Sequence, residues 1–117
     1  MANQKSSSFI EIDRPEQGVV VVVPSADIDM SRSPELRTVI RQEMGSSVHK
    51  LVVDLEEVHY MDSSGLATLV EAMRNASKSD TKLVICNMNP KVRAIFEIAR
   101  LDSFFSIVDS RDEAISL

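Results

Sequence analysis

The residues best suited to chemistry in this sequence are two adjacent serines, Ser63 and Ser64, which lie between Asp62 and Gly65. An apolar strand-like segment at 51–55 precedes them, and an apolar helix-like pattern follows directly. The cluster therefore falls at a strand-to-helix junction, where backbone N–H groups point outward and the helix dipole favours negative charge. A serine at such a junction can cap the helix, hold a phosphate or contact a partner, and the residues alone leave these roles open.

Catalysis by either serine is not favoured, because a nucleophilic serine needs a base and the base needs an orienting group. The sequence has two histidines, His49 and His59. His59 precedes Ser63 by four residues, but a solvent-facing histidine is the simpler interpretation. The segment also lacks the G-x-S-x-G pattern of a nucleophile elbow. We therefore predict no catalytic residue, and the chain is not expected to be an enzyme.

Metal and nucleotide sites are not indicated either. Asp27 and Asp29 share a polar loop, but they lack the further acidic positions and the glycine of a calcium loop. No cysteine or histidine spacing suits zinc, and three glycines leave little room for a phosphate loop. We predict no cofactor and no metal, and on the residues alone the two aspartates are interpreted as a solvated loop.

Composition and charge restrict the class of protein. The 117 residues, 44% of them hydrophobic, fit one globular domain. The net charge is −5 and the lysines and arginines are scattered, which argues against nucleic acid as a partner. Cys86 is the single cysteine and is predicted to be buried and inert. The polar N-terminus and the lack of a long apolar run predict a cytoplasmic protein that does not insert into a membrane.

The N-terminal part of the chain predicts a hairpin. Residues 1–7 are interpreted as a disordered tail, and the alternating pattern at 8–13 suits an edge strand. A turn at 14–18, containing proline and glycine, leads to five consecutive valines at 19–23, which predict a buried strand.

Strands and helices then alternate to the end of the chain. Ser33 is predicted to cap a helix that has proline in its first turn and stops at Gly45. The remaining predicted elements are a strand at 51–55, a helix from Ser63 to about Ser79, a strand at 83–86, a helix from Asn89-Pro90, a strand at 104–108 and a terminal helical turn at 112–117. The order ββαβαβαβα predicts a single α/β domain over 8–117, with helices packed against a mixed β-sheet.

These residues resemble a known family. The strand at 51–55, followed by V-H-Y-M-D-S-S-G-L at 58–66, is similar to the signature of anti-sigma factor antagonists, the STAS domain family. The segment A-D-I-D at 26–29 resembles the G-E-L-D loop of the family, with Ala26 where glycine is usual. Further similarity at 89–92, before the third helix of the family, and at 101–105, before its last strand, extends the resemblance over about 9–117.

The resemblance implies a function and a set of site residues. Such domains bind a cytoplasmic serine kinase that is also an anti-sigma factor, and thereby release a sigma factor. The kinase phosphorylates the serine directly after the aspartate, here Ser63; the phosphorylated form dissociates, and a phosphatase resets it. The implied partner-binding residues are Asp27, Asp29, Asp62, Ser63, Ser64 and Gly65. Gly65 is expected to let the backbone of the kinase approach closely.

Two other functions stay open at this point. Small STAS proteins also serve as non-switching accessory subunits of lipid-transport ABC complexes or of stress-signalling assemblies, and binding of a small ligand is not excluded. The complete D-S-S-G motif favours the phosphorylation switch. A monomer is the expected oligomeric state.

Overall fold

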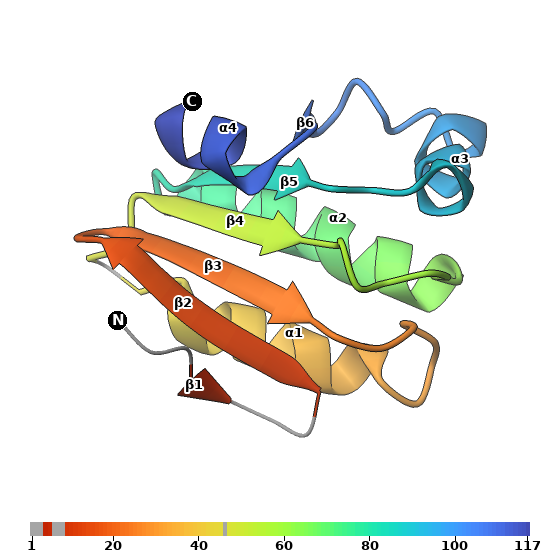
Figure 1. Cartoon of the computed structure of the whole chain (residues 1–117), viewed down its shortest axis with the longest axis horizontal. Helices are drawn as coiled ribbons and strands as arrows, with labels where there is room; N and C mark the ends of the chain where they lie inside the picture. The colour runs from red at the N-terminus through yellow and green to blue at the C-terminus, as the bar shows by residue number, and fades with distance from the viewer. Residues whose placement is uncertain (1–3, 6–8, 46) are drawn as a thin grey trace.

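The computed structural model describes residues 4–5, 9–45 and 47–117. Within them, six strands form one sheet in the order β1-β2-β3-β4-β5-β6 (Figure 1). The strands are β1 (Gln4–Lys5), β2 (Ile10–Glu16), β3 (Val19–Pro24), β4 (Lys50–Asp54), β5 (Lys82–Cys86) and β6 (Ser106–Val108). The helices are α1 (Ser33–Glu43), α2 (Ser63–Lys78), α3 (Pro90–Ile98) and α4 (Arg111–Ser116). From Ile10 onward, the predicted order ββαβαβαβα is confirmed.

The sheet is mixed, as the sequence predicts. β2 and β3 form an antiparallel hairpin around Gly18, whose φ of 80° lies in the region that favours glycine. β3, β4, β5 and β6 are parallel to one another, because a helix connects each strand to the next. The carboxyl ends of the parallel strands therefore meet at one edge of the sheet, where a binding site is usually found in open α/β sheets.

One prediction at the N-terminus needs correction. Within the predicted disordered tail at 1–7, Gln4 and Lys5 form the short strand β1, which pairs with Ile12 and Glu11 of β2. Without β1, β2 is an edge strand, and its outer N–H and C=O groups provide pairing sites for an additional strand. Residues 1–3, 6 and 7 of the predicted tail lie outside the described part of the chain.

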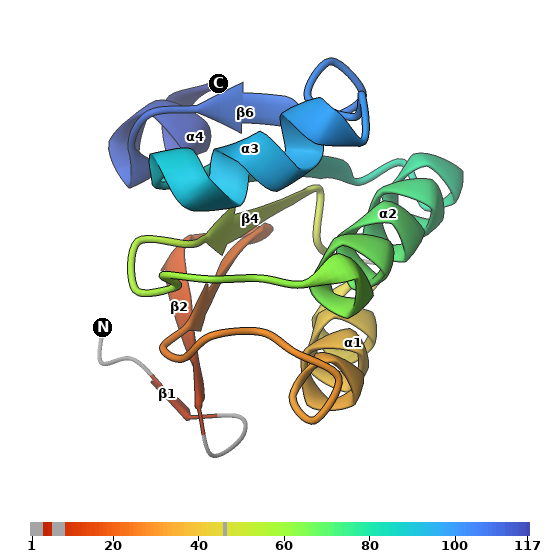
Figure 2. The ribbon, with the colours of Figure 1, turned by 90° about the vertical axis from the view of Figure 1, so that its right-hand side faces the viewer.

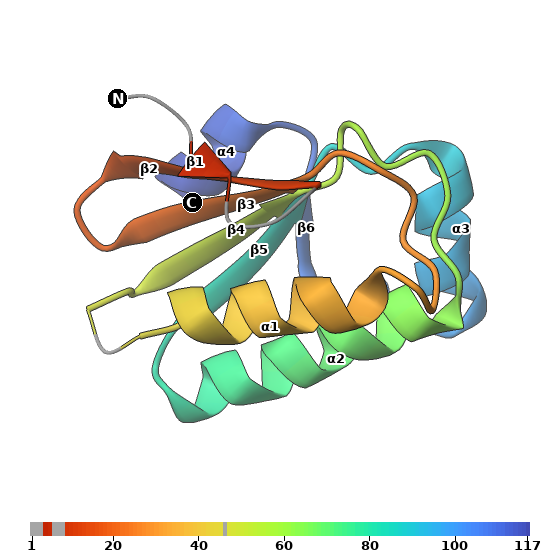
Figure 3. The same cartoon turned by 90° about the horizontal axis from the view of Figure 1, so that it is seen from below.

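Both faces of the sheet are covered, which explains the run of valines. Helices α1 and α2 lie against one face and α4 lies against the other (Figures 1 and 3). Alternate residues of each strand point to opposite faces. Val20 and Val22 accordingly join the core that contains the α1 and α2 side chains, whereas Val21 and Val23 join a smaller core with Ala114 of α4.

Two predicted element boundaries shift for local reasons. Ser33 does not cap α1: the N-cap residue is Arg32, without a side-chain hydrogen bond, and the backbone N–H of Ser33 donates to the carbonyl of Asp29 at 2.8 Å. The preceding turn thus already supplies an acceptor for the start of the helix. The last strand begins at Ser106 instead of Phe104, because Phe105 packs edge-to-face on Phe96 of α3, with ring centroids 5.2 Å apart.

Candidate functional site

The start of α2 gives Ser63 and Ser64 different environments. Asp62 is the N-cap residue, and its Oδ1 accepts hydrogen bonds from the backbone N–H of Ser64 at 2.9 Å and of Gly65 at 3.4 Å. The Ser64 hydroxyl donates to the same oxygen at 2.6 Å. Ser63 is exposed, and its hydroxyl makes no hydrogen bond to any residue that the structure describes. One serine therefore belongs to the cap, and the other is available to a partner.

Asp29 lies in an equivalent local arrangement on the neighbouring loop. Its Oδ1 accepts from the backbone N–H of Ser31 at 2.9 Å and from the Ser31 hydroxyl at 2.6 Å. These hydrogen bonds, chiefly the one from the hydroxyl, lower the pKa of Asp29. The Ser64 hydroxyl lowers the pKa of Asp62 in the same way, while the nearby negative charge of Asp29 acts in the opposite direction. Both carboxylates are thus ionised at neutral pH.

Two loops hold these carboxylates next to each other. Residues 25–32 follow β3 and residues 55–62 follow β4, and the two loops run side by side (Figures 2 and 3). A short parallel bridge joins Ile28 to Met61: the N–H of Ile28 donates to the Tyr60 carbonyl at 3.1 Å, and the N–H of Asp62 donates to the Ile28 carbonyl at 3.0 Å. This bridge fixes Asp29 beside Asp62 and Ser63.

Asp27 has a structural role in joining the loops. Its Oδ1 accepts from the backbone N–H groups of His59 and Tyr60, both at 3.1 Å. Asn89 lies at the end of the loop that follows β5 and caps α3, because its Oδ1 accepts from the N–H of Val92 at 2.8 Å. Its Nδ2 donates to the His59 carbonyl at 3.3 Å. The three loops after β3, β4 and β5 therefore form one connected surface, which we call the loop face.

Gly65 is required by packing inside the protein. It is buried, and a Cβ at this position would lie 2.5 Å from Cγ of Met61 and 2.9 Å from Cγ2 of Ile28. Both distances are shorter than real contacts allow. The glycine thus lets the first turn of α2 lie against the bridge between the loops, which differs from the predicted reason, namely the approach of a partner's backbone.

Two exposed apolar side chains on the loop face were not among the predicted residues. Met30 is 77% exposed and directly follows Asp29. Tyr60 is 53% exposed and directly precedes Met61 of the bridge. An apolar residue in a loop carries no periodic pattern that tells a buried side chain from an exposed one. Exposed aromatic and methionine side chains are enriched in protein interfaces.

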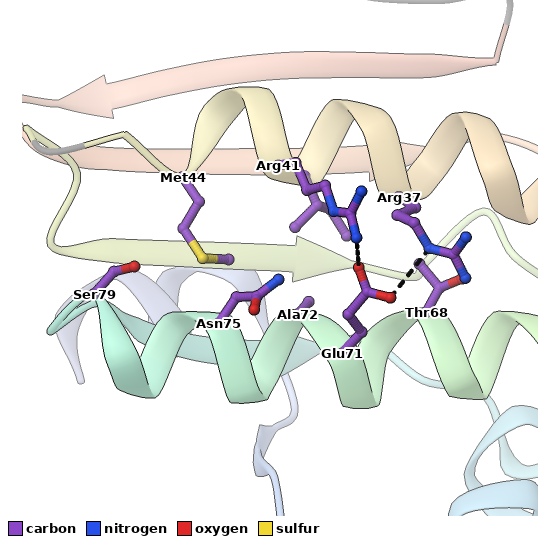
Figure 4. A pocket seen from close by; sticks show the side chains of 9 residues that line it. Arg37, Arg41, Met44, Thr68, Glu71, Ala72, Asn75 and Ser79 are labelled. Carbon is purple, nitrogen blue, oxygen red and sulfur yellow. Dashed lines mark hydrogen bonds and ion pairs between the residues drawn. The ribbon is translucent and has the colours of Figure 1, made fainter.

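A separate cavity lies between α1 and α2. It has a volume of about 260 Å³, and both Arg37 and Arg41 point toward Glu71 within it (Figure 4). The Arg41 guanidinium lies 2.5 Å from the Glu71 carboxylate and that of Arg37 lies 3.3 Å from it. Because these charges pair with one another, and because the cavity contains none of the predicted site residues, it is a weaker candidate than the loop face.

The described residues contain neither a metal-binding cluster nor a membrane-spanning helix. No cluster of three or more histidine, cysteine, aspartate or glutamate side chains with the arrangement of a metal site occurs among them. None of their helices has the length and apolar character needed to span a membrane.

Comparisons with known proteins show which family and which fold this chain is similar to. The family model described as STAS domain matches residues 12–114. The chain is 28% identical over 81 residues to the anti-sigma-B factor antagonist of Staphylococcus aureus, covering 69% of this chain and 75% of that protein. An anti-sigma factor antagonist from Mycobacterium paratuberculosis has a similar crystal structure, with a TM-score of 0.82, 27% identity and coverage of 92% and 90% of the two chains. The phosphorylated form of the Bacillus cell fate determinant SpoIIAA shares the fold, with a TM-score of 0.72, 20% identity and coverage of 92% and 96%.

Proposed function

Because this chain belongs to the STAS domain family, we propose that it is an anti-sigma factor antagonist that is switched off by phosphorylation of Ser63. In this proposal the loop face binds a cytoplasmic serine kinase that is also an anti-sigma factor, and binding releases the sigma factor. The observation that carries the proposal is the exposed Ser63 hydroxyl, which has no hydrogen-bond partner among the described residues and lies beside Asp29 and Asp62.

The position of Ser63 suits a phosphate acceptor. It is the first residue of a 16-residue helix, where the helix dipole stabilises negative charge. A phosphate adds about −1.5 to −2 charges at neutral pH. The domain is therefore expected to remain folded after modification, and the phosphorylated form of SpoIIAA, which has the same fold, supports this expectation.

Electrostatic repulsion explains why the phosphate would end binding. Asp29 and Asp62 are held ionised next to Ser63, so phosphorylation concentrates negative charge on a small part of the loop face. Across an interface these charges lose water, and unpaired charges there cost several kcal/mol. Since about 1.4 kcal/mol corresponds to a tenfold change in affinity, one phosphate is sufficient to separate the partners.

The other predicted residues have distinct roles in the proposed interface. Asp29, Asp62 and Ser63 contact the kinase directly, whereas Ser64 and Gly65 shape the start of α2 and Asp27 holds the loops together. A phosphatase resets Ser63. The domain extends over residues 8–117, acts in the cytoplasm as a monomer, and catalyses no reaction itself.

Phosphorylation by the kinase tests the proposal. The protein is incubated with ATP and each purified anti-sigma factor kinase of its source organism, and intact mass is measured. One of these kinases is expected to add one phosphate to the wild type and to Ser64→Ala, but none to Ser63→Ala. Ser64→Ala is a matched control because it removes the neighbouring hydroxyl.

Affinity provides the second half of the test. By isothermal titration, Ser63→Asp is expected to bind that kinase at least tenfold more weakly than the wild type. Phosphorylation of Ser63→Ala at the full rate would disprove the site. A stable complex with an ATPase subunit that is unaffected by ATP and by Ser63→Asp would instead identify a non-switching accessory subunit.

A further inference from the structure

A groove runs along α2 away from Ser63, and we call it the α2 groove. It has a volume of about 560 Å³, and Ser63 lies among the residues that line it. Apolar side chains line part of it, chiefly those of Leu66, Val70 and Leu101. On a helix, positions 63, 67, 70, 74 and 78 share one face, so the groove follows a single stripe of α2.

Positive charge gathers in the α2 groove although the whole chain has a net charge of −5. Its cationic side chains are Arg37 of α1 and Arg74 and Lys78 of α2. Among the described residues that line the groove, Glu71 is the one carboxylate, and Arg37 and Arg41 already lie 3.3 and 2.5 Å from it. Arg74 and Lys78 are exposed, and no carboxylate of the described residues lies within 4.0 Å of either.

This combination of charge and shape indicates the chemistry of an occupant. Apolar side chains in the groove can bury apolar groups, and the unpaired cations can pair with carboxylates. From Ser63, Arg74 lies about 16 Å and Lys78 about 22 Å along the helix axis, at 1.5 Å per residue. An occupant that contacts the loop face at Ser63 and also reaches both cations must span about 22 Å, so it is an extended or helical segment of a protein and not a compact small molecule.

We propose that the α2 groove binds an acidic, amphipathic segment of the anti-sigma factor kinase, an inference that rests on the proposed function. The carboxylates of the segment pair with Arg74 and Lys78, and its apolar side chains lie over Val70 and Leu101. The groove and the loop face thus form one continuous contact surface of two parts, with Ser63 at their junction.

The two parts respond differently to phosphorylation. The Debye length is about 8 Å at physiological ionic strength, which is shorter than the distance from Ser63 to Arg74. A phosphate on Ser63 therefore leaves the far cations largely unaffected. The α2 groove supplies affinity in both states, and the loop face supplies the switch.

Charge reversal in the groove tests the inference. The double variant Arg74→Glu/Lys78→Glu changes two exposed positions of α2, and circular dichroism verifies that it is folded. The kinase that phosphorylates Ser63 serves as the probe, and affinity and association rate are measured by surface plasmon resonance at salt concentrations from about 50 to about 300 mM. We expect the double variant to bind about tenfold more weakly and to lose most of the salt dependence of its association rate.

Lys82→Glu is the matched control. Lys82 is exposed at the start of β5, and the alternation of side chains places it on the sheet face opposite α2, together with Val84 and Cys86. Because it introduces the same type of charge change outside the groove, its affinity for the kinase is expected to stay within twofold of the wild type. The loss in Ser63→Asp and the loss in the double variant are expected to combine as independent effects.

The outcomes separate this inference from the proposed function. If Ser63→Asp weakens binding but Arg74→Glu/Lys78→Glu leaves it unchanged, the groove assignment is wrong and the switch stands. If no anti-sigma factor kinase binds the wild type, both are wrong. Binding to phosphatidylglycerol vesicles that the double variant abolishes, with unchanged kinase affinity, would assign the groove to an anionic surface and overturn the inference.

Discussion

Single residues at the start of α2 determine which serine of the D-S-S-G motif at 62–65 is available to a partner. Asp62 and the Ser64 hydroxyl complete a helix cap, and this leaves Ser63 exposed one residue away. Gly65 is equally specific, because its missing side chain makes room for Met61 and Ile28. The neighbours of Ser63 thus take part in hydrogen bonds and packing inside the domain, and the Ser63 hydroxyl remains available to a partner.

Replacing Gly65 by alanine is expected to destabilise the protein. The new Cβ would lie 2.5 Å from Met61 Cγ, and overpacking of this kind costs about 1 to 3 kcal/mol. Alanine in a helix offsets up to about 1 kcal/mol of this. Urea unfolding should therefore show a loss of about 1 kcal/mol or more. Gly45→Ala is the control, since no atom of the described residues, its chain neighbours aside, lies within 4 Å of the position that its Cβ would occupy, and it should change stability by less than about 0.5 kcal/mol. Equal effects of both substitutions would contradict the packing argument.

At the scale of elements, the loop face consists of the loops that follow β3, β4 and β5, which backbone and side-chain hydrogen bonds connect to one another. The Ile28–Met61 bridge and the hydrogen bonds of Asp27 and Asn89 connect segments that are about 30 residues apart in sequence. The position of Asp29 relative to Ser63 depends on these connections. A preorganised surface of this kind loses little conformational entropy when a partner binds.

Removing the Asp27 carboxylate is expected to loosen the loop that carries Tyr60. Asp27→Ala deletes the acceptor of two backbone hydrogen bonds, each of which contributes about 0.5–1.5 kcal/mol. Amide hydrogen exchange at His59 and Tyr60 should accelerate, and the free energy of unfolding should fall by about 1 kcal/mol. Asp27→Asn keeps an oxygen acceptor and should retain most of the protection. Wild-type exchange rates in Asp27→Ala would show that the loops are held together without this side chain.

At the scale of the whole molecule, the sheet separates two environments. One face carries α1 and α2 and leads to the loop face, while α4 closes the other face over Cys86. Two buried charged residues of the sheet hold α4 and the residue that follows it: Arg111 Nε donates to Asp54 at 2.9 Å, and Lys50 Nζ donates to the Leu117 carbonyl at 2.7 Å. The predicted buried position of the single cysteine is confirmed.

The reactivity of Cys86 reports on this closed face. Burial raises the pKa of its thiol from 9.0 to about 12, which lowers the thiolate fraction at pH 8 about a thousandfold. Ellman's reagent should therefore react with the native protein on the order of a hundredfold or more slowly than with the protein in urea. Comparable rates in both conditions would show that α4 does not cover the thiol.

The raised pKa of Cys86 also predicts a dependence of stability on pH. The folded state favours the neutral thiol, so this contribution to stability is complete below pH 9.0 and is lost as the pH rises toward about 12. Cys86→Ala should reduce the fall in the free energy of unfolding between these pH values. An unchanged pH profile in the variant would assign that fall to other groups.

Much of the fold follows from the sequence because its patterns are local. The five valines, the alternation of strand and helix patterns, and the caps at Asp62 and Asn89 depend on residues near one another in the chain. They are sufficient to predict the order of elements from Ile10 onward and the position of Ser63 at a strand-to-helix junction. Strand β1 was not predictable in this way, because two polar residues carry no pattern and pair only where β2 offers an edge.

The roles of residues within the site required the tertiary structure. Local sequence patterns were enough to place Asp27, Asp29, Asp62 and the two serines in loops or at a helix start. Only the fold joined these loops through Ile28 and Met61, turned the Asp27 carboxylate toward the backbone, and brought Arg37 of α1 into one groove with Ser63. The physical reason is that exposure, charge pairing and close packing depend on what lies opposite a residue in space, which its sequence neighbours do not specify.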